Sequence, residues 1–182
     1  MRRTTPLLLR RASLALALAL TCADLALAAP AQEVAPQPPA CQPDAEQALA
    51  LANAWRQEAR HCGGRAFEAA RPLRWNAALQ QSAQRFAAEL AARGELSHQG
   101  LSSPTLRERV RDTGYVLRAV GENLAAGPLG LDEAFSLWTA SAEHCANLMR
   151  ADFEELGLAC VGGSGRYERF WVLHLAAPAR RF

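Results

Sequence analysis

Three side chains in this sequence have the chemistry of a metal or acid–base site: His98, Glu122 and His144. Two imidazoles and one carboxylate can hold a zinc ion and leave one coordination position open, as a catalytic site requires. The three residues are far apart in the chain, so only the tertiary fold can bring them together. If it does, a metal-assisted hydrolase is one possible function.

The same residues also have a purely structural interpretation. Buried polar groups must find hydrogen-bond partners, and Glu122 and the two histidines can bond one another and backbone groups to brace loops. We favour bracing over metal-dependent chemistry, because a fold does not by itself imply an activity. His61 and His174 have no evident partner in the sequence and are taken as ordinary residues.

A serine hydrolase is not favoured, although Ser141 stands three residues before His144. Ser141 is expected to cap a helix, and a capping hydroxyl bonds to backbone N–H groups rather than to an imidazole. Asn123 and Asn147 are expected to brace a loop and a helix end.

Four cysteines follow the first 28 residues, which we interpret below as an export signal. An even number of cysteines in an exported protein predicts two disulfides. Zinc binding by these cysteines is not favoured, because none shows C-x-x-C spacing. A helix packed back on the following strand would pair Cys145 with Cys160, which leaves Cys41 for Cys62. A helix filling the interval between Cys41 and Cys62 would span ~27 Å, whereas a disulfide needs Cα atoms within ~7 Å. The first helix must therefore be shorter than its pattern, or its flanking segments must double back.

Apolar residues at helical spacing indicate four helical regions that begin at capping residues. Glycine ends most of them. They run from Asp44 to Gly63, Asn76 to Gly94, Ser103 to Gly114 and Asp132 to Met149, the last as two short helices divided at Ser141.

Strand signals follow at 115–124, 156–161 and 167–177, and glycines and a serine at 162–165 predict a hairpin between the last two. Along 167–177 both faces are mostly apolar. Each apolar face must meet another layer, so we expect an α+β fold with a small antiparallel sheet covered by helices on both sides.

Several short motifs also occur in a single register along the chain. They include Leu73-Arg74-Trp75-Asn76, Ser97-His98, Gly121-Glu122-Asn123-Leu124, Asn147-Leu148-Met149 and Phe170-Trp171. By these motifs the chain resembles bacterial CAP (SCP-like) domains from about Cys41 to Pro178. The resemblance implies a three-layer α-β-α sandwich with a surface cleft.

In this family the cleft is lined by histidines and acids that in some members hold a divalent metal such as zinc. The resemblance places His98, Glu122 and His144 in it, with Ser141, Asn123 and Asn147 in support. Ser141 stands where plant and animal members have a second glutamate, and Arg169-Phe170-Trp171-Val172 replaces a histidine-containing strand motif. We therefore expect a binding module for a lipid, glycan or protein ligand. The alternative is a metal-assisted hydrolase that uses His98, Glu122 and His144.

The N-terminus is typical of an export signal. Arginines precede an apolar run from Ala12 to Leu20, and Ala26-Leu27-Ala28 is a small-x-small cleavage site. We thus expect a signal peptide at 1–28, a Pro-rich linker at 29–40, a CAP domain at 41–182, and a secreted or periplasmic protein. A lipid anchor at Cys22 is less favoured, because Thr21 precedes it. The apolar run is also too short to span a bilayer.

The basic character of the chain belongs to this N-terminal segment. Removing residues 1–28 takes away four of the 20 basic residues and one of the 18 acidic ones, leaving a net charge of about −1. Nucleic acids and anionic membranes attract basic surfaces, so neither is an expected partner. No transmembrane segment is expected in the mature chain.

Overall fold

A four-stranded sheet forms the middle of the domain in the computed structural model, which describes residues 41–180. The predicted signal peptide, the predicted linker and Cys22 lie outside these residues. The strand order is β3-β5-β6-β4, from β3 (Arg74–Trp75), β4 (Leu117–Ala126), β5 (Glu155–Gly162) and β6 (Arg169–Pro178). β4, β5 and β6 pair antiparallel, as predicted, whereas the two-residue β3 runs parallel to β5 and makes the sheet mixed.

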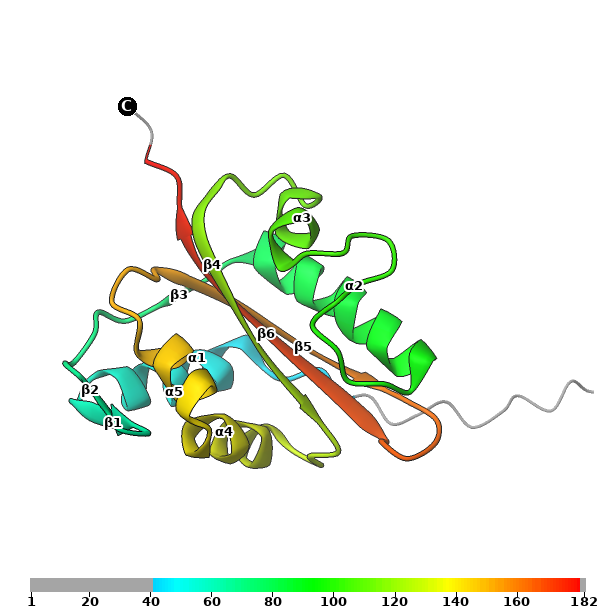
Figure 1. Ribbon diagram of the computed structural model, residues 1–182, viewed down its shortest axis with the longest axis horizontal. Helices are drawn as coiled ribbons and strands as arrows, with labels where there is room; N and C mark the ends of the chain where they lie inside the picture. The colour runs from blue at the N-terminus through cyan, green and yellow to red at the C-terminus, as the bar shows by residue number, and fades with distance from the viewer. Residues whose placement is uncertain (1–40, 181–182) are drawn as a thin grey trace, which may run out of the picture. The chain divides into compact units, whose positions relative to one another are not determined.

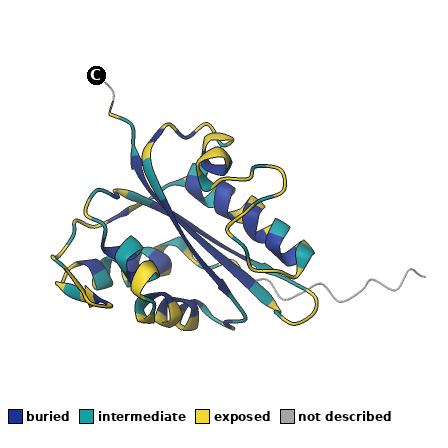
Figure 2. Ribbon diagram, viewed as in Figure 1, coloured by how far each residue is buried: buried dark blue, intermediate teal, exposed yellow. Residues whose placement is uncertain are grey.

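Helices cover both faces of this sheet, so the fold is the expected three-layer α+β sandwich (Figure 1). One face carries α2 (Ala77–Arg93) and α3 (Leu106–Arg111). The other carries α1 (Ala45–Arg56), α4 (Leu131–Ala140) and α5 (Ala142–Met149). In Figure 2 the strands are buried along most of their length, while the helices are exposed on their outer sides.

Alternation along β6 supplies both halves of the core. Phe170 and Val172 pack toward α2, whereas Trp171 and Leu173 pack toward α1 and α4. α2 lies so close to β5 that a Cβ on Gly157 would collide with the α2 backbone at Leu79. The sheet therefore has no solvent-facing side on which polar residues could alternate.

The helix ends match the predicted ones where a capping residue in the sequence fixes them. Asn76 accepts bonds from the first turn of α2, Gly94 ends it in the left-handed conformation, and Ser141 caps α5. α3 begins later than predicted, because Thr105 rather than Ser103 forms a capping box with Glu108.

The first helix is shorter than its apolar pattern. Asp44 caps it as predicted, but α1 ends at Arg56, and the hairpin of β1 (Arg60–Cys62) and β2 (Arg65–Phe67) follows. Gly63 turns this hairpin at a φ of 61°, a conformation that favours glycine.

The predicted disulfide pairing is wrong. Cys41 bonds to Cys160, and Cys62 bonds to Cys145. The segment before α1 runs beside β5, where Gln42 Nε2 donates to the Leu158 carbonyl and so aligns Cys41 with Cys160. The β1–β2 hairpin, absent from the prediction, carries Cys62 to α5. The bridges close intervals of 119 and 83 residues, which by loop entropy stabilise the fold by about 4–5 kcal/mol each.

Among residues 41–180, no helix combines the length and the apolarity needed to cross a membrane.

Candidate functional site

Glu122 is the centre of the candidate site. It lies on the edge strand β4, directly opposite His174 of β6, and its side chain is only 3% exposed. His98 Nδ1 lies 2.7 Å from Oε1, while His174 Nε2 and an Arg109 guanidinium nitrogen lie 2.9 and 2.8 Å from Oε2. We call these four residues the Glu122 cluster. Both carboxylate oxygens are thus occupied by nitrogen donors.

These donors keep the carboxylate ionised. Burial by itself would raise the pKa of Glu122, but hydrogen bonds from His174 and His98 and the charge of Arg109 outweigh it. The pKa of Glu122 falls to about 2. Since the carboxylate accepts only, each imidazole donates an N–H to it. Glu122 therefore carries no proton to donate near neutral pH and is only a weak base.

Arg109 supplies the permanent positive charge of the cluster. Its side chain is 6% exposed, its guanidinium stacks 3.6 Å above the Phe86 ring, and it also donates to the carbonyls of His98 and Ser103. α3 and α2 thereby fix the loop that carries His98. Arg109 is not among the residues selected from the sequence, although its place between Leu106 and Val110 on the apolar side of a short helix is a usable signal.

His98 is the exposed member of the cluster. It follows α2 in a loop, and its side chain is 63% exposed. The hydrogen bond to Glu122 raises the pKa of His98 more than burial lowers it. The cluster therefore presents one protonatable imidazole to solvent.

His174 was wrongly taken as a residue without a partner. It is fully buried, Nε2 bonds to Glu122, and Nδ1 has no hydrogen-bond partner within residues 41–180. Its position in register with Phe170 and Val172 on a buried strand face is the signal that it needs a polar partner.

His144 lies on α5, which covers the other face of the sheet, and its imidazole makes no hydrogen bond to Glu122 among the described residues. Burial, followed by the charge of His98, lowers the pKa of His144. The fold thus brings His98 into contact with Glu122, whereas His144 interacts with His98 through its charge.

The Gly-Glu-Asn motif connects the two faces. Gly121 leaves room for the Phe153 ring, since a Cβ there would lie 2.9 Å from it. Asn123 Nδ2 donates to the His144 carbonyl, and Asn147 Nδ2 donates to the carbonyl of Glu122 and to Asn123 Oδ1. These asparagines tie α5 to the strand, and Ser141 Oγ accepts from the His144 N–H at the start of α5.

The arrangement does not suit a metal ion. Residues 41–180 contain no group of three or more His, Cys, Asp or Glu side chains placed to hold one. Both oxygens of Glu122 already accept bonds, and the Arg109 guanidinium would repel a divalent cation at the same carboxylate. In this arrangement Arg109 supplies the positive charge that a metal would otherwise bring.

Comparison with known proteins finds one family model and several solved structures that are similar to this domain. Residues 49–175 match the cysteine-rich secretory protein (CAP) family model. An extracellular SCP-domain protein from Bacillus anthracis superposes with a TM-score of 0.61 at 23% identity, over 72% of this chain and 39% of that one. An outer surface protein from Borrelia burgdorferi gives a TM-score of 0.60 at 16% identity, over 77% of this chain and 99% of that one. At these identities the likeness is one of fold. No curated protein matches significantly.

Proposed function

Because this chain belongs to the cysteine-rich secretory protein (CAP) family, we propose that it is an exported binding module rather than a catalyst. Ligand recognition is assigned to the surface around His98 and His144, and the ligand is a lipid, glycan or protein group that forms a hydrogen bond with an imidazole.

The engagement of Glu122 by three donors is the observation that carries this proposal. A general base or a metal ligand needs an available lone pair, and three of the roughly four acceptor sites of this buried carboxylate already receive bonds from His98, His174 and Arg109. His98, by contrast, is mostly exposed and is held at Nδ1. Its Nε2 has no hydrogen bond among residues 41–180, so it can accept one from a ligand when the ring is neutral and donate one when the ring is protonated. Such a cluster fixes an imidazole for contact rather than for turnover.

Three histidine variants test the binding surface. His98→Ala and His144→Ala are compared with His61→Ala, a control at an exposed position of β1, using phosphatidylcholine vesicles and N-acetylglucosamine oligosaccharides as probes. We expect binding of one probe to be lost in the first two variants and retained in the control. Hydrolysis of an ester, peptide or glycoside that disappears in His98→Ala would instead establish an enzyme and overturn the proposal.

Export is supported separately by the two disulfides and by relatives described as extracellular and outer-surface proteins. Mass spectrometry of the protein from its native host should find Ala29 at the N-terminus. An acylated Cys22 there would contradict cleavage after Ala28 and support a lipid anchor.

A further inference from the structure

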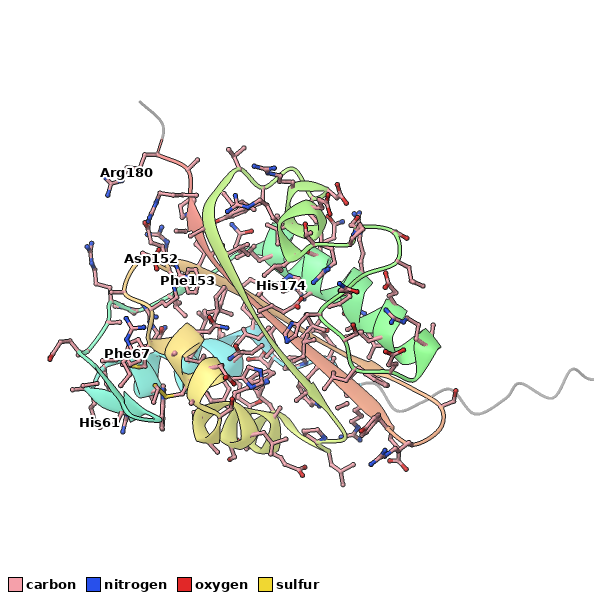
Figure 3. The ribbon with its side chains drawn as sticks, viewed as in Figure 1. His61, Phe67, Asp152, Phe153, His174 and Arg180 are labelled. Atoms are coloured by element: carbon pink, nitrogen blue, oxygen red, sulfur yellow. A yellow bond between two sulfur atoms is a disulfide. The ribbon has the colours of Figure 1, made fainter. Side chains whose placement is uncertain are left out.

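A polar cavity of about 380 Å³ lies at the end of the sheet where β4 begins and β6 ends. Four arginines and two acids line it, and we call it the arginine cavity: Arg71, Arg74, Arg118, Arg180, Asp152 and Glu154. Figure 3 labels Arg180, Asp152 and Phe153 toward this end and His174 over the middle of the sheet. Arg118 and Glu122 are four positions apart on β4, roughly 13 Å, so the cavity is separate from the Glu122 cluster.

Positive charge exceeds negative charge in this cavity. Asp152 is already bound at both oxygens by Arg150, which does not line the cavity, and also lies 3.6 Å from Arg118. These arginines lower the pKa of Asp152, so it stays ionised. Glu154 lies 3.9 Å from Arg74, with both side chains more than half exposed, a geometry that contributes little.

Two of the four guanidinium groups have no carboxylate partner in the part of the chain that the structure describes. Arg71 and Arg180 make no ion pair or side-chain hydrogen bond among residues 41–180. An arginine without a counter-ion beside a partly apolar wall, here Pro72 and Phe153, produces a strong local potential for an anion. The cavity is therefore positively charged, whereas the chain without residues 1–28 has a net charge of about −1.

Arg56 holds the cavity walls in place. It is fully buried and donates to the carbonyls of Arg71, Leu148, Arg150 and Phe153. Burial lowers the pKa of Arg56 to about 10. This value is still well above 7, so the side chain stays charged at neutral pH. One side chain thus fastens the segments 71–74 and 150–154, which carry four of the cavity's six charged groups, so this part of the site is preorganised for a ligand.

We propose that the arginine cavity binds a phosphate group, carried either by a small soluble molecule or by a lipid headgroup. Guanidinium groups match the oxygens of phosphate with paired N–H donors and keep their charge at any physiological pH. The volume exceeds that of inorganic phosphate and leaves room for the group to which the phosphate is attached. This site is independent of the function proposed for His98.

Calorimetry with glycerol 3-phosphate, and co-sedimentation with phosphatidylcholine vesicles with and without phosphatidic acid, test the two sources. The variant Arg71→Gln/Arg180→Gln removes the unpaired charges. The control Arg107→Gln/Arg166→Gln removes the same charge from exposed positions outside the cavity.

We expect the cavity variant to weaken binding by at least about tenfold, the control by less than about twofold, and added salt to weaken binding. Binding to phosphatidic acid vesicles alone identifies a headgroup site, and binding of glycerol 3-phosphate as well identifies a site for phosphate in solution. No binding of either probe, or equal weakening in both variants, overturns the proposal. An equal loss in His98→Ala would also overturn it, because it would place the phosphate at the Glu122 cluster.

Discussion

The Glu122 cluster and the arginine cavity are both built from charged residues, yet they use charge in opposite ways. In the cluster one buried carboxylate is bonded by Arg109, His98 and His174, and nearly every charge has a partner within hydrogen-bond distance. In the cavity Arg71 and Arg180 face two acids that are weakly engaged or already occupied.

The difference separates stability from binding. Charges that satisfy one another in a dry interior hold elements together and are costly to break singly. Charges left without a partner at the surface add little to the folded state and remain available to a ligand. The buried cluster should therefore govern unfolding, and the cavity should govern attraction of anions.

Replacing Glu122 is the strongest test of this contrast. Glu122→Leu leaves Arg109 buried without a counter-ion and should reduce the free energy of unfolding by about 3–5 kcal/mol. Arg71→Gln/Arg180→Gln should change it by less than about 0.5 kcal/mol, since both residues lack a partner. Urea unfolding of both variants measures the gap, and similar losses would break the distinction.

Acid titration should reveal the same buried carboxylate. The pKa of Glu122 is lowered from 4.5 to about 2 in the folded protein, so its contribution is complete above pH 4.5 and is lost as the pH falls toward 2. This amounts to about 3 kcal/mol. The measurement is the difference in unfolding free energy between wild type and Glu122→Gln across that window. A difference that does not change with pH would contradict the assignment.

Within the cluster, the smallest effect is expected at His98, its exposed edge. Its pKa is raised by Glu122, so its contribution is complete below pH 6.5 and is lost as the pH rises through the folded-state value. Because the side chain is 63% exposed, His98→Ala should lower the unfolding free energy by no more than about 1 kcal/mol at pH 6. The gap should shrink at higher pH, and His61→Ala should show none.

Local features of the fold were predictable from the sequence. Asn76, Gly94 and Ser141 end or begin helices through bonds to residues within four positions, so the sequence around each contains the whole interaction. The β5–β6 hairpin was predictable for the same reason, because its glycine-rich turn lies between the two strands.

Contacts between residues far apart in the sequence were harder to predict. Glu122 and His98 were selected as candidates and lie in contact, but His174 was dismissed although it lies opposite Glu122 in the next strand. The cysteine pairing failed because the short hairpin after α1 was read as helix, which hid the route from Cys62 to Cys145. These two misses concern residues more than 50 positions apart, where strand register or helix packing decides the contact.

By itself the sequence determined the apolar periodicity, the local helix caps and the even cysteine count, and hence a helix-covered sheet closed by two disulfides. Only the tertiary structure decided which residues complete the Glu122 cluster and that four arginines from separate segments line one cavity. The physical reason is range. Caps and periodicity depend on neighbours within a turn, whereas a charge acts on whatever the fold places within a few ångströms of it.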